Sequence, residues 1–423
     1  MTRFYFLVFI AAILLISCDT EKSGDAPLYY EQATKSFRDS LTAKLVNTDI
    51  LEALRNDPES SNYDKWKGAF WALGLTNLKS DYVHSRLKFA LNSYKEHPED
   101  FRRGLLEAII TLYPGEFSDK FNVLIEKESN PKLSAMLAYN LQLAGVSGNE
   151  ITTKMKKVFG TLGGHPILFM QQAYLGVAKE KQIENKPPLK ALIKGTAPGK
   201  NVIFSFQRVN RELPGLVVIR KSDGEFVKAE NDSIFYVPQF ARASSDMPGF
   251  LTNGNTPMGI MSFVGFGKSE NIFIGPTENL QLRLPYEADY QEYFHDQTKN
   301  LKWELPQYQN LLPVQWRGFT PILEAFYAGQ AGRTEIISHG TTINPEYYKK
   351  EIYYPNTPSL GCLTALELWD ENGQRIRSDQ QKLVNALKAN NISEGYFVVV
   401  DLDNKMLPVS IEELLNDYPE VFN

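Results

Sequence analysis

Two short stretches dominate the second half of this chain: Ile336-Ile337-Ser338-His339-Gly340 and, 23 positions after His339, Ser359-Leu360-Gly361-Cys362-Leu363-Thr364. The first ends an apolar, β-branched run, which is typical of a buried strand. A thiol is mostly protonated at neutral pH, so a reactive cysteine needs a base or a cationic neighbour. His339 is the nearest candidate for that base. The stretches therefore suggest acyl transfer through a thioester, with backbone amides near Gly361 stabilising an oxyanion.

The sequence around these stretches predicts a mainly β region over residues 200–423. β-Branched and aromatic runs bounded by Gly, Pro, Asn and Asp predict strands; they are Val202–Phe206, Leu216–Ile219, Met261–Val264 and Tyr396–Val400. Helices are expected near Pro321–Tyr327 and Asp379–Ala389.

Residues 28–185 have a different period, with apolar residues three and four positions apart. Arg86–Leu91 and Leu133–Leu141 are two of the amphipathic stretches, and Pro-containing breaks separate successive helices. No strict repeat is present, so the pattern suits an α-solenoid or an irregular helical bundle. The segment Lys186–Gly199, rich in Pro and Gly, marks the boundary. We therefore expect a two-domain α + β protein, all-α and solenoid-like first and mainly β second.

The amino-terminal residues read as an export signal. Arg3 precedes an apolar run over residues 4–16, which is too short to span a bilayer comfortably. The run ends at Ser17-Cys18, and Leu15-Ile16-Ser17-Cys18 resembles a bacterial lipobox, in which the cysteine becomes lipidated. We expect residues 1–17 to be a signal peptide, Cys18 to carry the lipid and residues 18–27 to be a tether. The resemblance implies a bacterial envelope protein held on the periplasmic side by its lipid.

Composition excludes some classes of partner and site. A net charge of -5 and a pI of about 5.7 indicate no basic surface for nucleic acid. No His, Cys, Asp or Glu cluster has metal-ligand spacing and no phosphate-binding loop is present, so no metal or cofactor is expected. The chain has two cysteines, so a lipidated Cys18 leaves Cys362 unpaired. An unpaired thiol in the envelope is either buried by accident or required for chemistry.

The two stretches resemble the L,D-transpeptidase (YkuD-type) family, whose signature is His-Gly or His-Ser followed by Ser-His-Gly-Cys. Upstream, Thr256-Pro257-Met258-Gly259 is similar to the Thr-Pro-x-Gly strand entry of that family. The resemblance covers roughly residues 216–407. Residues 281–330 read as an insertion and are a candidate lid over the substrate cleft.

The resemblance implies a role for each matching residue. Cys362 would be the nucleophile, His339 the general base, and the Gly340 carbonyl the group that orients the imidazole. Ser359 and Gly361 would shape the turn and the oxyanion site. The implied substrate is the peptidoglycan stem tetrapeptide, from which the enzyme releases D-alanine in cell-wall synthesis.

Two positions depart from the family pattern. Leu360 stands where the family has a histidine, and Thr364 stands where an arginine is usual. The second change removes a contact to a substrate carboxylate, for which Arg333, Arg317 and Arg242 are candidate replacements. His295, inside the insertion, has two interpretations: a solvated loop residue, or one that approaches the substrate cleft.

Several outcomes remain open at the level of the sequence. The acyl group can pass to an amine, giving a 3-3 crosslink, or to water, giving an L,D-carboxypeptidase. In another family of envelope cysteine peptidases the cysteine precedes its histidine, which disfavours that family here. The alternative from a different class is a non-catalytic, lipid-anchored scaffold that binds peptidoglycan or another envelope protein, with the helical region as the candidate partner surface.

Overall fold

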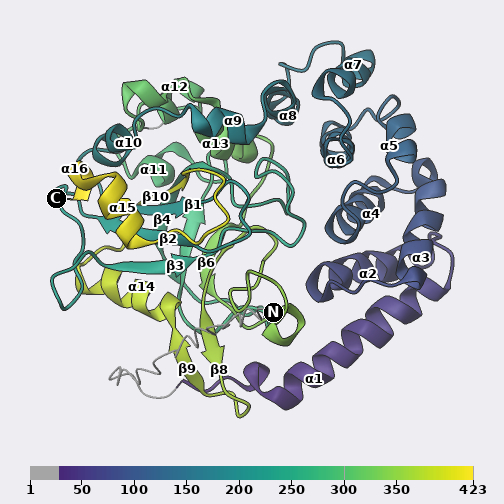
Figure 1. Cartoon of the computed structure of the whole chain (residues 1–423), viewed down its shortest axis with the longest axis horizontal. Coiled ribbons are helices and arrows are strands. Elements are labelled where there is room, and N and C mark those ends of the chain that lie inside the picture. The colour runs from purple at the N-terminus through teal and green to yellow at the C-terminus, as the bar shows by residue number, and fades with distance from the viewer. Residues whose placement is uncertain (1–27, 300, 423) are drawn as a thin grey trace, which may run out of the picture.

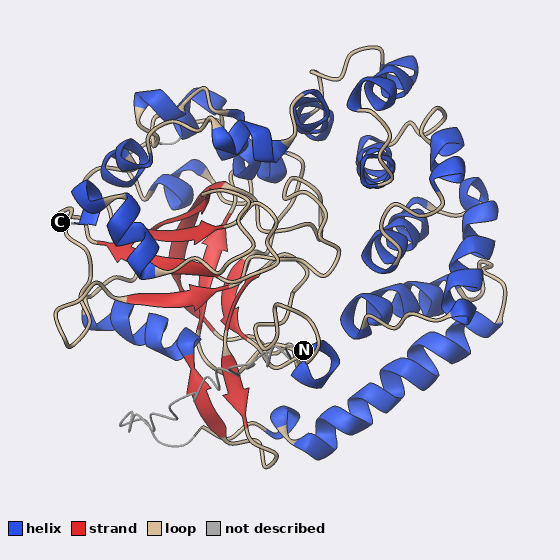
Figure 2. Cartoon of the chain, in the orientation of Figure 1, coloured by secondary structure: helices blue, strands red, loops and turns tan. Residues whose placement is uncertain are grey.

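The computed structural model describes residues 28–299 and 301–422. An all-helical region comes first and a mixed-sheet, nearly closed barrel follows (Figures 1 and 2), so the predicted all-α amino-terminal region is confirmed. The expected signal peptide, the expected tether and Cys18 all lie outside the described residues. Within the described residues, none of the helices has the length and apolar character needed to cross a membrane.

Eight helices form the region that we call the helical arc, residues 35–176. Several begin at a side chain that caps the first turn; Ser80, Asn130 and Ser147 each accept a hydrogen bond from a backbone N–H two or three residues later. The helices are α1 Lys35–Ala43, continued by a π-helix Lys44–Glu52, then α2 Tyr63–Thr76, α3 Asp81–Asn92, α4 Glu99–Leu112, α5 Ser118–Leu124, α6 Pro131–Leu143, α7 Gly148–Phe159 and α8 Pro166–Gly176. Short 3-10 turns lie at Glu31–Ala33, Ala53–Arg55 and Tyr94–Glu96.

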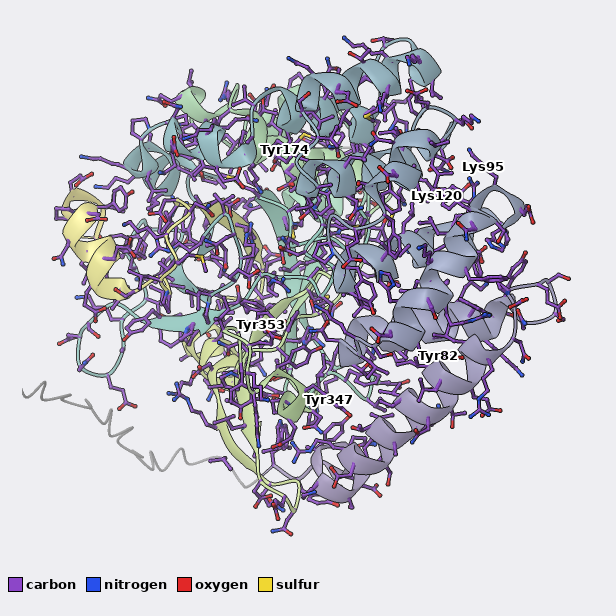
Figure 3. All side chains as sticks on the ribbon, turned by 45° about the vertical axis from the view of Figure 1, so that its right-hand side comes forward. Tyr82, Lys95, Lys120, Tyr174, Tyr347 and Tyr353 are labelled. Carbon is purple, nitrogen blue, oxygen red and sulfur yellow. The ribbon has the colours of Figure 1, made fainter. Side chains whose placement is uncertain are left out.

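Successive helices alternate between two sides of the arc. In Figure 1, α2, α4, α6 and α8 lie on the side of the barrel, whereas α3, α5 and α7 lie outside them. Figure 3 shows Tyr82, Lys95 and Lys120 on the outer helices and connections. This arrangement matches a solenoid, in which each helix pair packs on its neighbours.

Ten strands and six helices build the carboxyl-terminal part, which we call the barrel domain, residues 202–422. Eight strands form one sheet in the order β3-β2-β1-β10-β4-β5-β6-β7. The strands are β1 Val202–Gln207, β2 Gly215–Arg220, β3 Tyr236–Gln239, β4 Gly259–Gly267, β5 Asn279–Arg283, β6 Ile337–Gly340, β7 Leu363–Ala365, β8 Glu367–Trp369, β9 Arg375–Ser378 and β10 Gly395–Asp401. The helices are α11 Tyr290–Phe294, α12 Leu305–Gln309, α13 Glu324–Gln330, α14 Asp379–Ala389, α15 Ile411–Asp417 and α16 Pro419–Phe422, and 3-10 turns lie at Val314–Trp316, Thr320–Leu323 and Pro345–Tyr348.

The central strands are apolar on both faces because both faces are covered. In β1, Val202 and Phe204 belong to one apolar cluster and Ile203 to the other. The Ile203 side packs against α14 through Leu383 and Val384 and is continuous with the core of the helical arc. The Phe204 side packs against residues 183–197 and the insertion.

The two edges of the sheet meet, which nearly closes the barrel. Phe240, directly after β3, exchanges both backbone hydrogen bonds with Thr364 of β7, at 2.7 and 2.8 Å. Beneath this seam, the buried Gln239 amide donates to Ser338 Oγ of β6 at 3.0 Å. Closure removes the exposed edges of β3 and β7 near the site.

Gln281, the first residue of the expected insertion, lies within β5, and the segment continues through α11 and α12. Its helices pack on the outside of the barrel. The Tyr293 hydroxyl donates to the Ile260 carbonyl at 2.8 Å, and the Ile260 N–H donates to the Tyr308 hydroxyl at 2.7 Å. Since Tyr293, Tyr308 and Trp316 are fully buried, this segment is part of the core.

The breaker-rich segment between the two parts contains structure. α9 Lys179–Glu184 and α10 Leu189–Gly195 pack against the barrel domain. Lys179 Nζ lies 2.9 Å from both Glu324 Oε2 and Asp401 Oδ2; the two carboxylates are buried and the lysine is largely buried. The ion pairs fix the carboxyl-terminal end of the helical arc on the barrel.

The other end of the helical arc is also attached to the barrel domain. Tyr30 N–H donates to the Gly373 carbonyl, and Arg375 N–H donates to the Leu28 carbonyl, both at 2.9 Å. These bonds add the segment before α1 to the β8–β9 hairpin. The arc is therefore held at both ends.

Candidate active site

Parallel pairing of β6 with β7 places the two predicted catalytic residues on neighbouring segments of the chain, with Cys362 directly before β7. The register places His339 opposite Thr364 and Ser338 opposite Leu363. Side chains alternate along a strand, so Cys362, one residue before Leu363, lies on the face of Thr364 and hence of His339. The 23-residue separation is thus closed by neighbouring strands.

The His339 ring is held in one orientation and one tautomer. Its Nδ1 lies 2.8 Å from the Gly340 carbonyl oxygen. A carbonyl can only accept, so Nδ1 carries the proton and Nε2 has the free lone pair. Among the described residues, Nε2 has no hydrogen-bond partner. Burial lowers the pKa of His339 to about 4, so the ring is neutral at physiological pH and can accept a proton.

Gly340 provides that carbonyl and is also tightly packed. A methyl group at Gly340 would overlap the carboxylate of Glu367, a buried residue at the start of β8. The carboxylate accepts from Ser378 Oγ at 2.6 Å and from Thr277 Oγ1. Burial raises the pKa of Glu367, opposed by these hydrogen bonds. Only glycine fits between the histidine and this carboxylate.

The Cys362 thiol is partly exposed and lies over the start of β6. It donates to the carbonyl oxygen of Glu335 at 3.5 Å. Burial raises the pKa of Cys362, although the Ile337 amide and the Arg333 guanidinium act in the opposite direction. The raised pKa of the Cys362 thiol and the lowered pKa of the His339 imidazole mean that both groups are neutral at rest.

The turn before the nucleophile is built by Ser359. Its Oγ donates to the Cys362 carbonyl at 2.7 Å and accepts from the Gly361 N–H at 2.9 Å. The Thr256 hydroxyl of the Thr-Pro-Met-Gly motif donates to the Gly361 carbonyl at 2.9 Å. Because the Gly361 N–H is already bonded, it is not free to bind an oxyanion, and the part that Gly361 plays here is to shape the turn.

Arg333 lies next to this turn, and its guanidinium is bonded to backbone carbonyls. The side chain is 4% exposed. It donates to the Gly249 carbonyl, to the Asn255 carbonyl at 2.8 Å and to the Gly254 carbonyl at 2.6 Å. Burial lowers its pKa to about 10. These bonds engage the guanidinium in the protein, so Arg333 acts on the site through the backbone that it holds.

The other two candidate arginines are engaged elsewhere. Arg242 pairs with Glu212 at 3.3 Å and lies over the Tyr353 ring at 4.9 Å. It lines a cavity of about 210 Å³ between the helical arc and the barrel domain, with Tyr353 near the middle of the view in Figure 3. Arg317 bonds the Leu312 carbonyl at 3.2 Å within the insertion.

The two departures from the family pattern have different surroundings. Leu360 is 37% exposed beside the nucleophile. Thr364 is buried, and its hydroxyl donates to the Thr357 carbonyl at 3.1 Å. His295 is almost buried, with Nε2 2.9 Å from Ser262 Oγ and 2.8 Å from the Gly395 carbonyl. It lines a separate cavity of about 490 Å³ together with Gln281 and Arg283 of β5.

Sequence reasoning missed three residues that support the site: Glu367, Asn253 and Glu107. None lies in a recognisable motif, and each makes its contacts with residues distant in the chain. A buried carboxylate is visible only once the fold is known. No group of three or more His, Cys, Asp or Glu side chains in residues 28–299 and 301–422 is placed to hold a metal ion.

Comparison of the chain with protein-family models, with curated proteins and with solved structures found no match.

Proposed function

We propose that this protein is a cysteine-dependent acyltransferase of the L,D-transpeptidase type that acts on peptidoglycan stem peptides. The observation that carries the proposal is the position of His339 and Cys362 on one face of paired strands, with Nδ1 of the imidazole bonded to Gly340. This leaves Nε2 free to accept a proton on the face of the strands to which the register assigns Cys362.

The proposed reaction has two acyl-transfer steps. Cys362 Sγ attacks the carbonyl carbon of the third stem residue, and the thiol proton passes to His339 Nε2. Collapse of the tetrahedral intermediate breaks the C–N bond, and the departing D-alanine amine takes the proton from the imidazolium. The tripeptide remains as a thioester. An acceptor amine or water then attacks, its proton returns through His339 to sulfur, and the C–S bond breaks.

The neutral state of both Cys362 and His339 determines how the thiol would be activated as a nucleophile. Burial lowers the pKa of His339 and raises that of Cys362. The thiolate then forms as the proton moves during attack, and not as a standing ion pair. The nearby Arg333 charge favours the developing thiolate.

The test is incubation of the protein with purified tetrapeptide muropeptides, followed by mass spectrometry. We expect loss of D-alanine and a covalent tripeptide adduct on Cys362. Both should vanish in Cys362→Ala, and His339→Ala should lose turnover. His84→Gln, a change of a partly exposed histidine on the helical arc, is the matched control. Absence of both release and adduct in the unaltered protein would rule out the reaction.

A second function is favoured by the raised pKa of Cys362 and by Leu360 at the family's histidine position. It is a non-catalytic envelope scaffold in which the barrel domain binds peptidoglycan and the helical arc binds a partner. Pull-down with insoluble peptidoglycan separates the two functions. Binding by Cys362→Ala equal to that of the unaltered protein, together with no adduct, supports the scaffold.

We also propose that the chain is anchored in the bacterial envelope through lipid on Cys18. The Ser17-Cys18 junction after the apolar run supports this. Expression with a radiolabelled fatty acid should label the full chain, and Cys18→Ala should abolish labelling. Equal labelling of the two would refute the anchor.

A further inference from the structure

The helical arc contacts the loop beside Cys362 through a half-buried carboxylate, that of Glu107. Glu107 of α4 points to the loop of the barrel domain at residues 249–255, which we call the site loop. Both Glu107 carboxylate oxygens accept from the Asn253 side-chain amide at 3.0 Å. Its side chain is 18% exposed, and Arg103 Nη1 lies 3.9 Å away. Asn253 is thus held from the opposite domain.

The same loop holds the residues beside the nucleophile. Arg333 donates to the carbonyls of Gly249, Gly254 and Asn255. Gly361 packs so closely on Arg333 and on the Gly254 carbonyl that a methyl group there would overlap both. Movement of the site loop would therefore move Arg333 and the turn that carries Cys362.

A second bond from the helical arc reinforces the first. Lys132 of α6 donates from Nζ to Thr252 Oγ1 at 2.9 Å. Two neighbouring residues of the site loop, Thr252 and Asn253, are therefore hydrogen-bonded to two different helices. Asn253 has φ of +59°, a conformation that few side chains other than Asn tolerate. The loop is fixed by its contacts with the arc as well as by its own backbone.

We propose that Glu107 is a positioning residue for Cys362, acting through Asn253 and the site loop to hold Arg333 beside the nucleophile. The helical arc is then a structural part of the site. This inference deepens the proposed function, on which its catalytic meaning rests, but the position of Arg333 relative to the thiol can be measured without substrate.

The test uses the rate of Cys362 alkylation by iodoacetamide as a function of pH in the full chain. The midpoint reports the thiol pKa, and the plateau reports access to the thiol. Removing the Arg333 charge from the vicinity should raise the midpoint by about one pH unit, equivalent to about tenfold slower alkylation below it. We expect this in Glu107→Ala and in Asn253→Gly, which keeps a backbone free to adopt positive φ.

Three further variants make the result specific. Glu107→Gln retains an oxygen that accepts from Asn253, so it should keep the wild-type midpoint. Glu150→Ala, a change at an exposed ion pair of α7, should also keep it. The double variant Glu107→Ala/Asn253→Gly should shift the midpoint no further than either single change.

Unchanged midpoints in Glu107→Ala and Asn253→Gly would overturn the proposal, as would additive shifts in the double variant. Should Glu107→Ala melt below the assay temperature, Asn253→Gly decides in its place: a raised midpoint supports the proposal and an unchanged midpoint overturns it. A failed muropeptide assay would refute the proposed reaction and leave this measurement intact, because no substrate is used.

Discussion

Replacing Gly361 with alanine tests whether the nucleophile turn is as tightly held as the contacts indicate. Gly361 has φ of +117°, which an L-residue adopts at a cost of about 1–2 kcal/mol. The added methyl group would also lie 2.6 Å from the Gly254 carbonyl oxygen and overlap the Arg333 guanidinium. Arg333 cannot swing away without breaking its bonds to the site loop, so overpacking adds about 1–3 kcal/mol. We expect a total loss of about 2–5 kcal/mol of unfolding free energy.

Gly224 offers the matched control. It has φ of +96° and no atom within 4 Å of an added methyl group. Gly224→Ala therefore carries the backbone cost alone, about 1–2 kcal/mol. Urea denaturation monitored by far-UV circular dichroism and by tryptophan fluorescence gives both free energies, provided that the two probes coincide. Equal losses in the two variants would refute the crowding of Gly361 by Arg333 and the site loop.

Three other changes have defined outcomes. Burial raises the pKa of Glu107 to about 7, so the protein should lose about 3 kcal/mol of unfolding free energy as pH rises from the unfolded-state pKa through 7. Urea titrations at pH 4.5 and 8 should show this loss in the unaltered protein and not in Glu107→Gln. The same change with pH in both proteins would contradict the prediction. Lys179→Met removes the ion-pair partner of buried Glu324, whereas Asp401 keeps Arg211 at 2.6 Å; the change should cost about 3–5 kcal/mol, read as a lowered urea midpoint against the exposed control Lys181→Met. Because the pKa of His339 is about 4, the rate of D-alanine release should hold down to about pH 5 and fall as the ring becomes protonated through pH 4. A fall in rate centred near pH 6.5 would instead indicate a ring that is not buried.

Long, periodic segments were predicted well because their folding signal is local. The strand expected over Val202–Phe206 is β1, and the helix expected over Asp379–Ala389 has those bounds. Strands of three or four residues, such as β7, are too short to show a period. α10 forms inside the segment rich in Pro and Gly because Leu192 and Ile193 have the barrel to pack against, a tertiary contact that the local sequence does not encode.

The same distinction between local signals and tertiary contacts applies to the site. His339 and Cys362 are recognisable by residue type, because few side chains can serve as nucleophile and base. Their shared face depends on a parallel register that no local pattern specifies. Arg333 was a candidate to bind the substrate carboxylate because it is cationic, but its guanidinium donates to three backbone carbonyls of the protein. The effect of Glu107 depends on contacts between parts of the chain separated by 146 positions.

Attachment of the helical arc at both of its ends changes what a break in it would do. Cutting the backbone in the loop at residues 113–117 would give one fragment that begins with the strand added to the β8–β9 hairpin and another that carries the Lys179 ion pairs. Each fragment therefore keeps its own contacts with the barrel domain. A nicked protein should therefore migrate as one particle in gel filtration and separate only in denaturant.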